Sequence, residues 1–153
     1  FADPVAAFAN IRRSLRPGGR LAFVCWRALE ENPLDFLPLR AAAAHLPPQP
    51  VPDSDEPGPF SFADAGRMRD ILGRAGFAKI AMAARDEKVG SGDLETMLTV
   101  CSRVGALGRI LRENPGLRET ALPAVRSALA AHDGPDGVKL NAATWIVTAR
   151  VPV

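Results

Sequence analysis

Leu15-Arg-Pro-Gly-Gly-Arg-Leu-Ala-Phe-Val24 is the stretch of the chain that decides its fold. Before it, an Asp3-Pro4 pair typical of a helix start precedes apolar residues that recur at helical spacing as far as Leu15. Proline then forbids another helical turn, and the two glycines are expected to supply a positive-φ corner. The apolar run of residues 21–26 is typical of a strand that is buried on both faces. The stretch therefore predicts a helix, a tight reversal and a strand.

The same order returns further along the chain. Asp64 caps a second amphipathic helix that Gly76 ends, and residues 77–87 read as a strand. Between the two strands we expect a short helix over residues 34–46 and then an extended, proline-rich surface loop over residues 47–59.

The rest of the chain is helical until its last strand. Helical spacing continues from Asp93 to Asn114, which predicts one continuous segment. A further helix is expected to extend to about Ala131, with Pro123 opening or kinking it. Residues 142–151 close the chain as a strand.

Three of these segments resemble a known family. The first stretch is similar to the LkPGGxLxxx segment that joins the fourth helix to the fifth strand in class I S-adenosylmethionine-dependent methyltransferases. Leu72-Gly-Arg-Ala-Gly-Phe77 resembles the LxxAGF that enters their sixth strand. Ala143-Thr-Trp-Ile-Val-Thr-Ala-Arg150 looks like their last strand. The resemblance covers nearly the whole chain and implies the C-terminal portion of a bacterial, small-molecule type of methyltransferase.

The expected fold class is α/β, the C-terminal half of a Rossmann-like sheet with helical lid insertions. A helix joins the first two strands as a crossover, so these strands should run parallel. The resemblance implies an antiparallel last strand between them. Residues 1–153 would be part of one methyltransferase domain. Its insertions, residues 28–60 and 90–137, would form a substrate-side cover, because ligands bind beyond the carboxyl ends of parallel strands.

The resemblance implies S-adenosyl-L-methionine as the cofactor. The family's glycine-rich loop and its ribose-binding acidic residue have no counterpart in this chain, which begins without Met just before a helix start. We therefore expect most of the cofactor site in a missing N-terminal half of the same protein, and an inactive fragment without it. Only Phe1, Ala2 and Asp3 correspond to positions near the methyl-transfer centre, and Asp3 is better explained as a helix cap.

Four residues are candidates for binding the acceptor: Trp26, Arg27, Asn32 and Phe36. Packing beneath the cover would also explain Trp26, and a solvated surface charge would also explain Arg27. Met97 and Leu98 could line the same apolar pocket, although methionine and leucine at helical spacing more often form core. A sulfonium is already electrophilic, so the protein mainly positions the acceptor. The sequence singles out no catalytic base.

Composition excludes several other classes of function. The net charge is only +2, with 6% aromatic residues, no tyrosine and scattered arginines, which argues against nucleic acid as a partner. No apolar run approaches the ~18 residues of a membrane span. Two isolated histidines and the absence of HExxH or CxxC spacing argue against a metal site. Cys25 and Cys101 read as buried thiols of a reducing, cytoplasmic compartment. The alanine and arginine bias is typical of GC-rich bacterial genomes.

Two other readings stay open from the sequence. The polypeptide could act only as an inactive binding or assembly module, because half a parallel sheet exposes an edge through which it would dimerise, swap strands or aggregate. It could instead belong to another Rossmann-like enzyme such as a reductase. Residues upstream of Phe1 would separate these readings.

Overall fold

The computed structural model describes residues 1–48 and 57–153, which divide into two compact units. The described residues of the first unit are 1–28, 57–86 and 143–153. Those of the second unit are 29–48 and 87–142, which come largely from the two segments expected as insertions. Most of the loop predicted over residues 47–59 lies outside the described residues.

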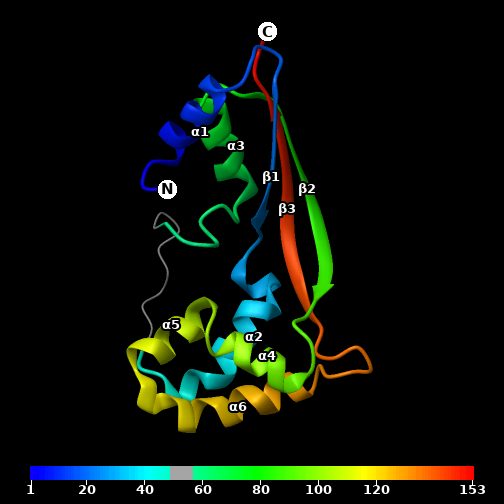
Figure 1. Ribbon diagram of the computed structural model, residues 1–153. Coiled ribbons are helices and arrows are strands. Elements are labelled where there is room, and N and C mark those ends of the chain that lie inside the picture. The colour runs from blue at the N-terminus through cyan, green and yellow to red at the C-terminus, as the bar shows by residue number, and fades with distance from the viewer. Residues whose placement is uncertain (49–56) are drawn as a thin grey trace. The chain divides into compact units, whose positions relative to one another are not determined.

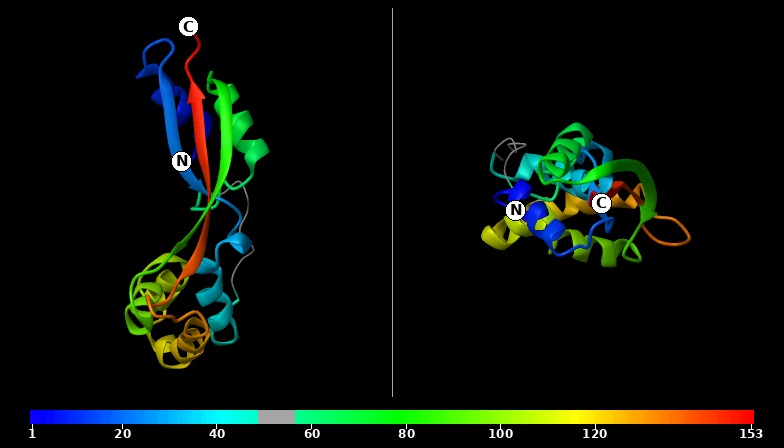
Figure 2. Two further views of the ribbon diagram at one scale, coloured as in Figure 1. Left: turned by 90° about the vertical axis from the view of Figure 1, so that its right-hand side faces the viewer. Right: turned by 90° about the horizontal axis from the view of Figure 1, so that it is seen from above.

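A three-stranded sheet organises the first unit. Its strands are β1 (Arg20–Trp26), β2 (Ala78–Val89) and β3 (Leu140–Arg150), in the order β1-β3-β2. Figure 2 shows the last strand between the other two. β1 and β3 pair antiparallel, with Phe23 opposite Val147, and β2 also runs opposite to β3 (Figure 1). The central place of the last strand is therefore confirmed. Because β1 and β2 both run opposite to it, they point in the same direction without pairing with each other.

Two helices, α1 (Pro4–Arg13) and α3 (Ala65–Arg74), lie on one side of this sheet (Figure 1). Their apolar faces and the inner face of the sheet form one core, which includes Phe8, Met68, Ile71, Leu72, Ala75, Phe77, Val147, Ala149 and Val151. On the other side of the sheet, Val24 is 63% exposed and its cross-strand neighbour Ile146 is 39% exposed. The expected burial of β1 on both faces is wrong for the described chain, because both helices of this unit cover the same face.

The two corners of the first unit use glycine for different reasons. Gly18 has a φ of +72°, as expected, but Gly19 does not have a positive φ. A Cβ at Gly19 would instead lie 2.7 Å from the carbonyl oxygen of Arg16, so this position needs glycine because the backbone passes too close. At the end of α3, Gly76 has a φ of +88° and the amide of Phe77 donates to the carbonyl of Leu72, 3.0 Å away, as in a Schellman cap.

The second unit is helical and has its own core. It contains α2 (Pro33–Ala42), α4 (Leu94–Cys101), α5 (Gly105–Glu113) and α6 (Arg118–Ala130), with short 3-10 turns η1 (Leu29–Glu31), η2 (Ala43–His45) and η3 (Pro115–Leu117). The core residues are Ala42, Met97, Cys101, Leu107, Leu111, Ala121, Val125, Leu129, Val138 and Leu140. Met97 is thus core, and Leu98 packs against the same core.

One helix prediction for this unit is wrong. The segment expected to be continuous after Asp93 is broken between α4 and α5, where Val104 is extended and Gly105 has a φ of +72°. Apolar residues keep helical spacing across the break because both helices face the same core. Pro123 lies inside α6. None of the helices in the described ranges is long and apolar enough to cross a membrane.

Candidate functional site

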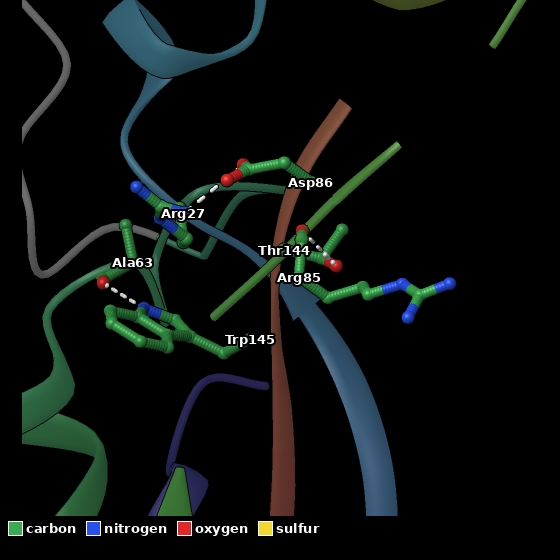
Figure 3. A network of polar contacts seen from close by, with 6 residues as sticks. All are labelled: Arg27, Ala63, Arg85, Asp86, Thr144 and Trp145. Carbon is green, nitrogen blue, oxygen red and sulfur yellow. Dashed lines mark hydrogen bonds and ion pairs between the residues drawn. The ribbon is translucent and has the colours of Figure 1, made fainter. Parts of the chain in front are cut away.

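Arg27, the residue directly after β1, is at the centre of a group of contacts in the first unit (Figure 3). Its Nη1 lies 3.1 Å from a carboxylate oxygen of Asp86 on β2, and its guanidinium carbon lies 5.4 Å from the ring centre of Trp145 on β3. The backbone amide of Arg27 donates to the carbonyl of Ala143 at 3.0 Å. We call Trp26, Arg27, Asp86 and Trp145 the strand-end cluster.

The side chains around Arg27 are themselves held in place. The indole Nε1 of Trp145 donates to the carbonyl of Ala63 at 2.8 Å, and the hydroxyl of Thr144 donates to the carbonyl of Arg85 at 3.1 Å. The ring of Trp26 lies 6.3 Å from that of Phe60. These contacts join all three strands to the loop before α3.

The chemistry available to the strand-end cluster is recognition. The Arg27 side chain is only 17% exposed and is paired, while that of Asp86 is 55% exposed and can accept hydrogen bonds from a ligand. The two indoles add flat apolar surface. Within the described ranges, no three histidine, cysteine, aspartate or glutamate side chains gather as a metal site would require.

A pocket of about 490 Å³ lies in the second unit. Apolar side chains and one arginine line it: Leu29, Phe36, Leu39, Arg40, Ala43, Leu46, Pro47 and Pro48. The guanidinium carbon of Arg40 lies 5.7 Å from the ring centre of Phe36. We call this the α2 pocket, because α2 supplies three of these residues.

Asn32 and Phe36 have different surroundings although both were expected at the acceptor. Phe36 lines the α2 pocket, whereas Asn32 is fully buried and is not among the lining residues. The carbonyl of Asn32 accepts from the amides of Asp35 and Phe36, both at 3.0 Å. Asn32 therefore sets the start of α2 rather than lining the pocket.

The residues expected near the methyl-transfer centre lie at the start of α1. Phe1 is 65% exposed, and its ring meets that of Phe8 edge-on at 6.0 Å and that of Phe62 at 6.4 Å. Ala2 is exposed. Asp3 accepts from the amide of Ala6 at 2.9 Å, which confirms it as the cap of α1.

Neither cysteine has the environment of a nucleophile. Burial raises the pKa of the Cys25 thiol, which donates to the carbonyl of Phe62 at 3.7 Å. Burial, and then the charge of Asp35, raise the pKa of Cys101 to about 11. Burial also raises the pKa of Asp35. Both thiols are therefore protonated at neutral pH, where a reactive cysteine needs its thiolate.

The structure divides the expected acceptor residues into two pairs. Trp26 and Arg27 lie in the first unit, and Asn32 and Phe36 in the second. Sequence reasoning missed Asp86, Trp145 and Arg40 as site residues. Arg40 had a local signal, because it follows Phe36 by four positions and so shares its helix face. Trp145 had none, since its contact with Arg27 joins residues far apart in the chain.

Comparisons with known proteins find likenesses among solved structures. No family model matches the sequence, and no curated protein matches it. Among solved structures, the chain is similar to that of a "putative methyltransferase" from Bacillus halodurans C-125, with 16% sequence identity and a TM-score of 0.44. The match covers 100% of this chain and 60% of the other, so the chain spans less than two thirds of that protein.

Proposed function

We propose that this chain is the C-terminal portion of a longer, S-adenosylmethionine-dependent methyltransferase that acts on a small molecule. The observation that carries the proposal is the position of β3 between β1 and β2, antiparallel to β1. This is the arrangement that the resemblance of the three sequence segments implies. The glycine corners at Gly18 and Gly76 also lie where the resembling segments require a reversal.

The described residues fit only a small part of the cofactor. Phe1 offers an exposed ring beside Phe8 and Phe62, which suits one wall of a site for a flat base. Asp3 already caps α1, so its carboxylate is not placed as a ribose ligand. We therefore propose Phe1 and Ala2 as the contribution of this chain, with the remaining cofactor ligands upstream.

The role proposed for this chain is to hold the acceptor. When bound, the cofactor supplies an electrophilic methyl group, and transfer needs an acceptor atom held in line with it and shielded from water. In the first unit, Trp26 would provide apolar contacts, and Arg27, with Asp86, would provide polar ones. In the second unit, Phe36 is proposed as an apolar contact within the α2 pocket. Asn32 would support the helix that presents Phe36. No base is assigned, because only an acceptor that must lose a proton needs one.

The test is an assay of the longer gene product. It is incubated with S-adenosylmethionine carrying a labelled methyl group and a panel of small acceptors, and S-adenosylhomocysteine is measured. We expect acceptor-dependent formation of S-adenosylhomocysteine. Oxidation of a nicotinamide cofactor without methyl transfer would favour a reductase, and tight, salt-dependent binding to RNA or DNA would contradict a small-molecule acceptor.

A further inference from the structure

Helix α2 presents apolar residues on two faces. One face packs against the core of the second unit through Leu34, Leu37 and Ala41. The other carries Phe36, Leu39 and Arg40, which line the α2 pocket with Ala43 just beyond the helix. Positions separated by three, four and seven residues share one side of a helix, so these four form a continuous strip.

The α2 pocket has the size and composition of a small-molecule site. Its volume of about 490 Å³ lies within the ~300–1,000 Å³ typical of such sites. Such sites are mostly apolar and contain a few polar groups that orient the ligand. Here seven of the eight lining residues are apolar and the eighth is Arg40.

Arg40 lies against an aromatic ring. Arg27, Arg109 and Arg126 each pair with a carboxylate. The guanidinium of Arg40 instead lies over the Phe36 ring, and no carboxylate of residues 1–48 or 57–153 pairs with it. Stacking on the ring orients the planar guanidinium while leaving its N–H groups available. The pocket therefore combines an apolar cavity with an oriented cation.

We infer that the α2 pocket binds small molecules that carry one carboxylate on an apolar body. The hydrocarbon or aromatic body fills the cavity, and the carboxylate accepts paired hydrogen bonds from Arg40. An alcohol of the same shape would lose the charge-assisted bonds, and an amine would be repelled. The inference uses the second unit alone and goes beyond the proposed function, since it requires no methyl transfer.

The experiment is isothermal titration calorimetry of the full chain with three matched probes. These are 4-phenylbutyrate, 4-phenylbutan-1-ol and 4-phenylbutylamine, which share a body and differ in the end group. We expect the acid to bind about tenfold or more tightly than the alcohol, as the loss of a charge-assisted hydrogen bond predicts. The amine should not bind measurably. Absence of binding by the acid, or equal affinity for acid and alcohol, overturns the inference.

Three variants locate the binding. Arg40→Met keeps the aliphatic stem and should reduce affinity for the acid to that for the alcohol. Ala43→Trp adds bulk at an exposed lining position and should abolish binding of both. Arg109→Met removes an equal charge from an exposed position on α5 and should change neither affinity. Circular dichroism establishes that each variant is folded. Unchanged binding in Arg40→Met or in Ala43→Trp places the ligand elsewhere and overturns the inference, whatever the outcome of the methyl-transfer assay.

Discussion

The guanidinium of Arg27 stacks over the indole of Trp145, with 5.4 Å between the guanidinium carbon and the ring centre. This contact joins the residue that follows β1 to the middle of β3, and the ion pair with Asp86 extends it to β2. One side chain thus connects the end of β1 to both other strands. A largely desolvated cation over an indole is worth more than one in open solvent.

Replacing Arg27 should destabilise the chain more than replacing an ordinary surface arginine. We expect Arg27→Ala to lower the free energy of unfolding by about 1 kcal/mol, because it loses the ring contact and the partly exposed ion pair together. Urea denaturation measures the effect. Arg74→Ala is the control, since among the described residues Arg74 pairs with Asp70 alone and both are exposed; its effect should stay within about 0.5 kcal/mol. Equal losses in the two variants would contradict a structural role for the stack.

The two tryptophans should respond differently to the same substitution. Trp145→Phe removes the donor to the carbonyl of Ala63 and should cost about 1–3 kcal/mol of unfolding free energy. Trp26→Phe keeps an aromatic ring against Phe60, and no described residue accepts a hydrogen bond from the Trp26 indole, so the loss should be smaller. Urea denaturation of both variants gives the comparison. A larger loss in Trp26→Phe would show that burial, not the hydrogen bond, dominates.

Local sequence patterns predicted the helices and strands of this chain better than they predicted the contacts between them. Asp3 and Asp64 cap helices as expected, and the glycine after each of two helices turns the chain. The break at Gly105 escaped prediction, because two helices that face one core keep the spacing of a single helix. The exposure of Val24 was not predicted either, because an apolar run does not show on which face of the strand the neighbouring helices lie.

The candidate site was harder to predict for a related reason. Trp26 and Arg27 could be named because they end a strand, and Phe36 because it lies in an expected cover. Their partners Asp86 and Trp145 come from other strands, and strand register is set by the whole sheet rather than by local sequence. Only Arg40 could have been identified from spacing, because it follows Phe36 by four positions and so shares its helix face.

Titration of this chain with S-adenosylmethionine should give no appreciable heat of binding. Phe1 and Ala2 would offer only part of one wall, and the carboxylate of Asp3 beside them caps α1. Isothermal titration calorimetry on residues 1–153 makes the measurement, and the longer protein proposed above would provide the positive control. Micromolar affinity of the chain alone would place the cofactor site within these residues.

Asp93 should make the stability of the chain depend on pH under acid conditions. Its carboxylate accepts from the amide of Thr96 at 2.8 Å at the start of α4, and hydrogen bonds from Thr96 hold its pKa below the ordinary value. A lowered folded-state pKa stabilises the fold above the unfolded pKa of ~3.9, and this contribution is lost as the pH falls towards the folded pKa.

The matched variant is Asp93→Asn, which can still cap the helix but does not titrate. We expect the wild-type chain to have the higher Tm at neutral pH. The difference in Tm should shrink as the pH falls below the ordinary pKa of aspartate. Thermal unfolding at a series of pH values checks this. A difference that stays constant with pH would show that the charge of Asp93 contributes nothing.

Gly137 should be the less replaceable of two glycines in one turn. Its φ is +79°, and a Cβ there would lie 2.1 Å from the carbonyl oxygen of Gly92. That oxygen accepts from the amide of Val138 at 3.0 Å, and Gly92 directly precedes the cap of α4.

A methyl group at Gly137 must therefore displace backbone that starts a helix, in addition to the cost of a positive φ for alanine. We expect Gly137→Ala to lower the free energy of unfolding by about 2 kcal/mol or more. Gly134→Ala is the matched control, because it lies in the same turn, has no positive φ, and its added Cβ would meet no atom closer than 4.0 Å. Urea denaturation should show a change within about 0.5 kcal/mol for this control. If the two variants unfold at the same denaturant concentration, the close approach of Gly137 to Gly92 does not constrain the fold.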